Sequence, residues 1–274
     1  MRLTKILCLF GVLCQAAVFA QSSGEPMEGG ARALGMANAA LTIDGAWALF
    51  QNQAGLASVD AFSAGAFYQA RFGMRELSTA GFAAALPLGS GAAGVSYRQY
   101  GYSAYREQHV GLAYGMKLGE ALDAGVQLDY VGVFLGGGYG STAAFTFQGG
   151  FRYRAGNNVT LAGHVYNPIR ARLSTFNDER LPAVLRLGGQ YRFSERVALN
   201  AEVRKHLAYP VSLAVGLEYQ VVSDFYVRAG IAGEPSRYSF GAGYRTGSFQ
   251  FDIAASHTEV LGFTPQISLT YHAK

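Results

Sequence analysis

Residues 110–130 read VGLAYGMKLGEALDAGVQLDY, and this stretch decides the fold class. Apolar side chains alternate with glycine, alanine or polar ones on both sides of a four-residue interruption, Leu118 to Ala121. Successive side chains of a β-strand point to opposite faces, so a period of two predicts two strands, each with one apolar face and one small or polar face. The interruption is short enough to join the two strands as a hairpin.

The same alternation runs through the rest of the chain. From residue 60 to the C-terminus it recurs in fourteen segments. An even number of strands returns the chain to the side on which it started, as single-chain bacterial outer-membrane barrels require. Most connections are very short, and one, from Asn167 to Pro182, is much longer, as external loops of such barrels often are. The sequence therefore predicts an all-β fold, an antiparallel transmembrane β-barrel of about 14 strands over residues 60–274.

The composition of the two faces favours a membrane barrel over a soluble exported β-protein, which is the alternative. Only 15% of the residues are charged, and the polar faces carry Gly, Ala, Gln and Arg rather than Lys and Glu. Tyr and Phe recur at the ends of the apolar faces, where membrane barrels have aromatic girdles. The side chains expected to face lipid are Leu128, Phe147, Leu187 and Leu217, and those expected to face the lumen are Gln127, Gln148, Arg186 and Glu218.

The first twenty residues have the pattern of a secretory signal peptide. Arg2 and Lys5 precede an apolar stretch that ends at Ala20, where small residues predict cleavage. Both cysteines, Cys8 and Cys14, lie within this stretch, so the mature chain is expected to hold no disulfide. Export together with the barrel pattern predicts a location in the bacterial outer membrane.

Residues 21–59 lack the alternation and are rich in Gly and Ala. They include GGARALGMANAA at 29–40 and DGAWALFQNQAGLA at 44–57. These two stretches resemble the opening of the FadL-like transporters and of the PorV/PorQ proteins of the Bacteroidetes type IX secretion system. Members of that superfamily begin with a GAR-x-x-GMG stretch and an NPAGLA motif, followed by a fourteen-stranded barrel. In this chain Gln53 replaces the proline of that motif.

The resemblance implies that residues 21–59 fold into the lumen as a short, partly helical plug, with Asn52 near the turn into the barrel. Glu28, Arg32 and Asp44 would then meet charged side chains of the wall. An ordinary Gly-rich leader is the alternative. The residues that carry the resemblance are Gly30, Arg32, Gly35, Met36, Asn52, Gln53, Ala54 and Gly55.

The polar faces of the expected strands carry charges that would point into the lumen. Such charges must be paired, plugged or hydrated. They could form a polar conduit or a lattice that grips the plug, although structural ion pairs alone are the simpler explanation. A polar lumen also argues against a fatty-acid conduit. The expected lumen charges are Arg152, Arg186, Arg204, Arg228, Asp123, Asp129, Glu202 and Glu218, joined by Arg71, Arg98 and Asp252.

Nothing in the sequence predicts an enzyme, a metal or a cofactor. The five histidines are scattered, and there is no GxSxG or HExxH motif. A net charge of +4 gives no support for nucleic-acid binding. The expected partners are outer-membrane lipid and other secretion or surface proteins. Two functions stay open: a PorV/PorQ-like component associated with protein secretion or surface attachment, slightly favoured by the short loops and charged lumen, and a FadL-like channel for hydrophobic or other small compounds.

Overall fold

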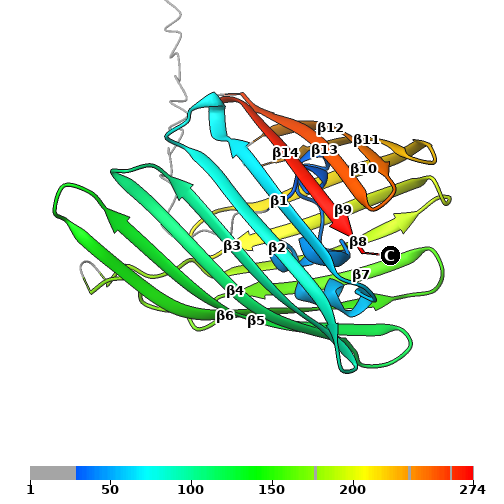
Figure 1. Cartoon of the computed structure of the whole chain (residues 1–274), viewed down its shortest axis with the longest axis horizontal. Helices are drawn as coiled ribbons and strands as arrows, with labels where there is room; N and C mark the ends of the chain where they lie inside the picture. The colour runs from blue at the N-terminus through cyan, green and yellow to red at the C-terminus, as the bar shows by residue number, and fades with distance from the viewer. Residues whose placement is uncertain (1–28, 176–177, 234–235, 260, 274) are drawn as a thin grey trace, which may run out of the picture.

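Exposed and buried side chains alternate along the strands of the computed structural model, which describes residues 29–175, 178–233, 236–259 and 261–273. These residues form fourteen strands, which close into a barrel with every strand antiparallel to its neighbours (Figure 1). Strand β1 pairs with β14 and closes the ring. The strands are β1 (Ser63–Ala70), β2 (Ser78–Leu88), β3 (Gly91–Gly101), β4 (Tyr105–Lys117), β5 (Leu122–Leu135), β6 (Gly140–Arg154), β7 (Val159–Tyr166), β8 (Val184–Arg192), β9 (Val197–His206), β10 (Val211–Val222), β11 (Phe225–Ala232), β12 (Arg237–Thr246), β13 (Phe249–Thr258) and β14 (Gly262–His272).

The register of the barrel puts apolar side chains outside and polar ones inside. Leu128 pairs with Phe147 across β5 and β6 on the outer face, and these side chains are 54% and 44% exposed. Their neighbours Gln127 and Gln148 pair on the inner face and are buried. A continuous apolar outer surface is stable in lipid and unfavourable in water. The antiparallel transmembrane barrel predicted from the alternation is therefore confirmed.

The two ends of the barrel differ. The start of β1 and the end of β14 lie together, because Ser63 pairs with His272; this end is called the terminal end here. It also carries the tight turns that follow β2, β4 and β6. The opposite end is called the far end, and it carries the connections that follow β1, β3, β5 and β7.

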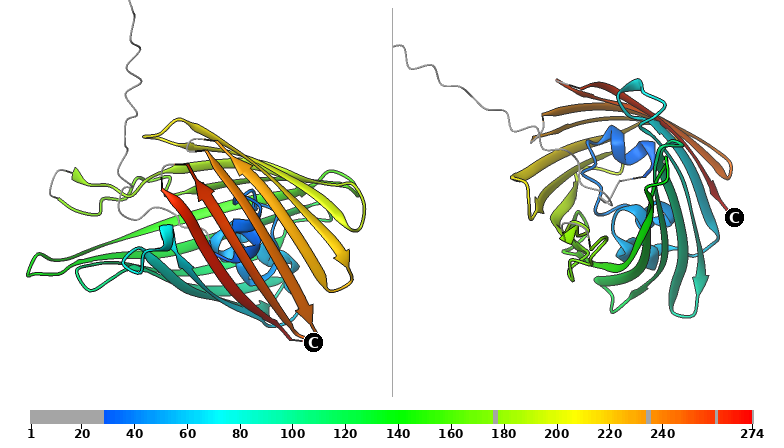
Figure 2. Two further views of the ribbon diagram at one scale, coloured as in Figure 1. Left: turned by 90° about the horizontal axis from the view of Figure 1, so that it is seen from above. Right: turned by 90° about the vertical axis from the view of Figure 1, so that its left-hand side faces the viewer.

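Residues 29–59, called the N-terminal segment, lie inside the ring of strands (Figure 2). The segment contains α1 (Ala31–Gly35), η1 (Gly45–Phe50) and η2 (Gln53–Ser58). A further short helical turn, η3 (Arg71–Gly73), follows β1. None of these helices is long and apolar enough to cross a membrane. The expected signal peptide, its cleavage after Ala20, and the remainder of the expected plug up to residue 28 lie outside the described residues.

The connection between β7 and β8, called the β7–β8 segment (residues 167–175 and 178–183), folds inward at the far end. Its side chains Leu173 and Leu181 are buried in one cluster with Val131, on the inner face of β5. The sequence predicts only a long external loop here. Burial of apolar inward positions explains the difference, because covering them with leucines removes apolar surface from water.

Asn167 holds the β7–β8 segment in place. It is fully buried with a left-handed φ of 49°, a conformation that asparagine tolerates better than most residues. Its amide nitrogen donates to the Leu181 carbonyl at 2.7 Å, and its amide oxygen accepts from Thr146 at 2.6 Å. On the exposed part of the segment, hydrogen bonds from Arg180 hold the pKa of the Asp178 carboxyl below its ordinary value.

Candidate functional site

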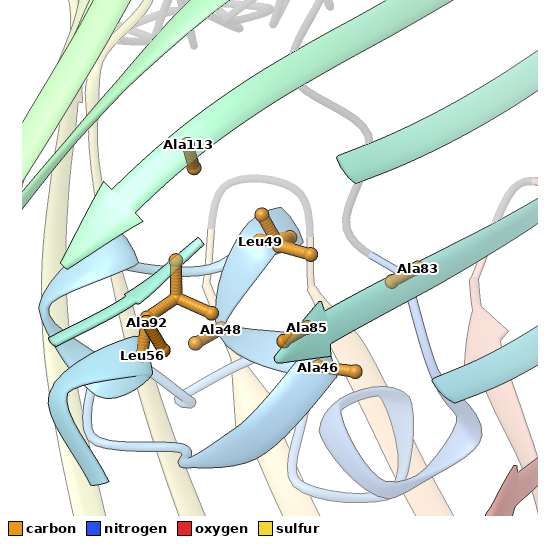
Figure 3. Packing of buried hydrophobic residues seen from close by; sticks show 8 residues of the cluster. All are labelled: Ala46, Ala48, Leu49, Leu56, Ala83, Ala85, Ala92 and Ala113. Atoms are coloured by element: carbon orange, nitrogen blue, oxygen red, sulfur yellow. The ribbon is translucent and has the colours of Figure 1, made fainter. Parts of the chain in front are cut away.

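The N-terminal segment packs on the wall through small apolar side chains. Figure 3 shows Leu49 of η1 and Leu56 of η2 in a buried cluster with alanines of the wall. Alanine at these inward positions lets the helical turns approach the strands closely. The other members of the cluster are Ala46, Ala48, Ala83, Ala85, Ala92 and Ala113.

Trp47 fixes the segment against β1 and β14. Its indole nitrogen donates to the Thr270 hydroxyl at 2.8 Å, so the buried N–H is satisfied. Gly65 leaves room for the ring, because a Cβ there would lie 2.6 Å from Trp47 Cζ2. Phe50 and Phe67 extend the contact as an edge-to-face pair with ring centres 5.5 Å apart.

Glycines of the wall receive the backbone of the motif residues. A Cβ at Gly216 would lie 2.5 Å from the Met36 Cβ, and one at Gly125 would collide with the Gln53 backbone. Glycine at these inward positions therefore lets the segment lie directly against the wall, because any larger side chain would displace it. The glycines that meet Met36 or Gln53 in this way are Gly115, Gly125, Gly216 and Gly230.

The small motif residues Gly30, Gly35, Ala54 and Gly55 fill tight positions. Gly30 has a φ of 93° and lies against the Trp47 ring. Gly35 packs directly on Gly241 of β12, where a Cβ would be 3.2 Å from the Gly241 Cα. Ala54 and Gly55 are fully buried in η2, and a Cβ at Gly55 would collide with the Ile43 carbonyl.

Gly55 provides a direct test of this packing. Gly55→Val should overpack the segment and destabilise it by about 1–3 kcal/mol, which corresponds to a rise of roughly five- to 150-fold in local opening. Trypsin cleavage at Arg32 in the intact barrel measures that opening. Gly119→Val is the matched control, because no atom lies within 4 Å of a Cβ placed there. Equal cleavage rates in the two variants would contradict the packing argument.

Asn52 caps η2, the last helical turn before the barrel. The link into β1 follows η2 and runs from residue 59 to residue 62. The side-chain oxygen of Asn52 accepts from the Ala54 N–H at 3.2 Å, and its amide nitrogen donates to the carbonyls of Leu41 and Phe151, both at 3.1 Å. These three hydrogen bonds satisfy the side-chain amide of Asn52, which is fully buried.

The first charged cluster joins the segment to β5 and β6. Arg152 donates to Asp123 at 3.0 and 2.8 Å, and Arg154 donates to the same carboxylate at 3.0 Å. Arg152 also pairs with Asp44 of the N-terminal segment and donates to the Ser58 hydroxyl at 2.6 Å. The wall therefore supplies two arginines for one carboxylate, and the segment supplies the second carboxylate.

The second charged cluster shows the opposite imbalance. Arg228 of β11 donates to Glu218 at 2.6 Å and to Asp252 at 2.7 Å. Arg32 of the N-terminal segment donates to Glu218 through two bonds, at 2.9 and 2.7 Å. Here the wall supplies one arginine for two carboxylates, and the segment supplies the second cation.

In the third charged cluster, the side chain that the described segment contributes is neutral. Arg186 donates to both oxygens of Glu202, at 2.6 and 3.0 Å, and Arg204 donates to Glu202 at 3.1 Å. Gln51, fully buried in the segment, accepts from Arg186 through its backbone and side-chain oxygens at 3.2 and 3.1 Å. The wall here keeps two cations for one carboxylate.

Asp129 is held by amides. Gln127 and Gln148 each donate to one of its oxygens, at 2.7 and 2.8 Å. Gln53 of the segment donates to Gln127 at 3.3 Å, so the motif position that departs from proline joins this polar layer. Leu49 and Phe50 of the segment and the wall residues Arg98, His109 and Tyr166 enclose a cavity of about 30 Å³ beside Asp129.

The structure places all eight charges expected in the lumen at inward positions, together with Arg98 and Asp252. It brings seven of the eight into the three clusters and leaves Asp129 with the amide layer. Arg71 lies beyond β1, in η3, with its guanidinium 5.8 Å from the Tyr100 ring centre. Sequence reasoning missed Gln51 and Arg154; the alternation could have identified Arg154, because it shares the face of Arg152.

Within the described strands, the inward face carries more cations than carboxylates. The ten inward cations are Arg98, Lys117, Arg152, Arg154, Arg186, Arg192, Arg204, Arg228, Arg237 and Arg245. The six inward carboxylates are Glu107, Asp123, Asp129, Glu202, Glu218 and Asp252. The described residues contain no group of three or more His, Cys, Asp or Glu side chains that could hold a metal ion.

No family model matches the sequence, and no curated protein matches it. Similar solved structures include the CymD monoaromatic hydrocarbon channel, with 12% identity and a TM-score of 0.68 over 89% of this chain and 97% of that chain. The Pseudomonas putida toluene transporter TodX has 13% identity and a TM-score of 0.63 over 90% and 99%. A Pseudomonas aeruginosa FadL homologue has 15% identity and a TM-score of 0.62 over 88% and 97%. The chain shares the fold of these FadL-like barrels.

Proposed function

We propose that the protein is a FadL-like outer-membrane channel for small compounds and that the N-terminal segment closes its lumen. One observation carries the proposal: the segment supplies the carboxylate that the Arg152 cluster lacks and the cation that the Arg228 cluster lacks. Complementary charge on both sides fixes the segment in one position. The polar partners of the segment can be hydrated when it is released, whereas the apolar packing of Leu49, Leu56 and Trp47 favours the closed position.

The fold similarity supports this function over a PorV/PorQ-like role in protein secretion, which the sequence alone slightly favours. The similar structures are a hydrocarbon channel, a toluene transporter and a FadL homologue, and none is a secretion component. In the proposed orientation the terminal end faces the periplasm, as expected for the end with short turns. The lumen of this chain is charged, so we propose solutes that are polar rather than hydrocarbons.

Loosening the two complementary contacts tests the function. In the double variant Arg32→Gln with Asp44→Asn, each wall cluster keeps its own ion pairs, but the segment loses both charges. The charged hydrogen bonds of Arg32 to Glu218 contribute about 1.5–3 kcal/mol, and the contact of the more exposed Asp44 contributes less. The open fraction should therefore rise at least about tenfold, measured as conductance in planar bilayers.

The control is Asp224→Asn, an exposed carboxylate in the turn between β10 and β11. It should leave the conductance at the wild-type level. Heat-modifiable migration in detergent gels verifies that each variant is folded. A folded double variant that conducts no more than the wild type would contradict closure by the segment.

A further inference from the structure

The wall and the N-terminal segment contribute differently to the charge of the lumen. The ten inward cations exceed the six inward carboxylates by four, with the histidines neutral. The described part of the segment carries Arg32 and Asp44, which cancel. The inward face of the described strands, which lines the lumen after withdrawal of the segment, therefore carries a formal charge of +4.

The excess positive charge extends from one end of the lumen to the other. Arg98 and Arg237 lie near the far end, since β3 ends and β12 begins there. The third cluster, with two arginines for Glu202, also lies toward the far end, since β8 begins and β9 ends there. At the terminal end, Arg192 and Arg245 donate to the neutral side chains of Gln190 and Gln250, at 3.4 and 2.9 Å.

We propose that the open lumen selects small anions, and that the solutes of this channel are small organic or inorganic anions such as carboxylates. This inference rests on the proposed function and names its substrate class. Fixed positive charge along a water-filled passage with low-dielectric walls raises the local concentration of anions and lowers that of cations. Arginines remain charged at any physiological pH, so this selectivity persists across that range.

Ion selectivity in planar bilayers tests the proposal. The full-length wild type and the Arg32→Gln/Asp44→Asn variant are each inserted into a bilayer that separates about 0.1 M KCl from about 0.01 M KCl. At these salt concentrations fixed charges act over roughly 10–30 Å. The reversal potential gives the permeability ratio of chloride to potassium. We expect a ratio well above one. A ratio of one or below would overturn anion selectivity while leaving the channel itself intact.

Reversing the charge of two inward arginines tests whether the selectivity comes from the wall. Adding Arg192→Glu and Arg245→Glu brings the formal wall charge from +4 to zero, because each change removes two charges. Both arginines bond to glutamines, so the carboxylate clusters keep their partners. The permeability ratio should fall to near one.

The matched control makes the same charge change outside the wall, with Arg75→Glu and Arg196→Glu at exposed connections. It should keep the parent ratio. An equal fall in the control would overturn the assignment to inward residues. If neither the wild type nor the loosened variant conducts, the proposed function fails, which is distinct from conduction without anion preference.

Discussion

Arg228→Met is expected to destabilise the barrel by about 3–5 kcal/mol, the usual cost of removing one partner of a buried ion pair. The Arg228 side chain is 1% exposed and is bonded to both Glu218 and Asp252. Its loss leaves Asp252 buried without that cation and leaves Glu218 with Arg32 alone. Urea unfolding of the protein refolded into lipid vesicles measures the change.

A second substitution separates lost charge balance from lost packing. In Arg228→Met/Asp252→Asn the unpaired carboxylate becomes a neutral amide, and Gln250 still lies beside it. This double variant should recover much of the stability lost by the single one. If the two variants were equally unstable, packing rather than charge balance would account for the loss.

Leu128→Arg is expected to cost about 2–4 kcal/mol, because it places a cation on the lipid-facing side at mid-membrane depth. Leu128 lies at the middle of β5 and its side chain is 54% exposed. Leu118, in the turn after β4 and 57% exposed, supplies the depth control. Leu118→Arg should cost only about 0–1 kcal/mol.

The same vesicle unfolding assay compares the two leucine variants. A large cost at both positions would mean that residue 118 also lies in hydrocarbon. A small cost at both would contradict the lipid-facing assignment of the outer surface. The difference between them therefore measures how the barrel sits in the membrane.

The fold was predictable from sequence because strand faces follow a period of two that needs no long-range information. Leu128 and Gln127 point to opposite sides wherever the strand lies, so their environments follow from the alternation alone. The same reasoning places Arg152 and Glu218 inside. The alternation does not predict which charged residues bond to each other. Their partners lie on other strands and on the N-terminal segment, and these come together only when the ring closes.

The details that sequence reasoning missed depend on such contacts. The resemblance implies that Asn52 lies near the turn into the barrel, but only the structure shows that it caps η2 and bonds to Phe151 of β6. The inward fold of the β7–β8 segment depends on apolar positions such as Val131, which no local pattern links to Leu173. Gln51 is uncharged and follows no motif, so only its contact with Arg186 reveals its place in the site.

The link between the N-terminal segment and β1 determines the kinetics expected of the proposed closure. Only four residues, from Val59 to Phe62, separate η2 from the wall, a reach of about 14 Å when extended. The last turn of the segment therefore stays within that distance of the wall even when its contacts are broken. A tethered group of this kind acts at an effective concentration in the millimolar range. Under the proposed closure, return of the segment is therefore a first-order event that does not depend on protein concentration.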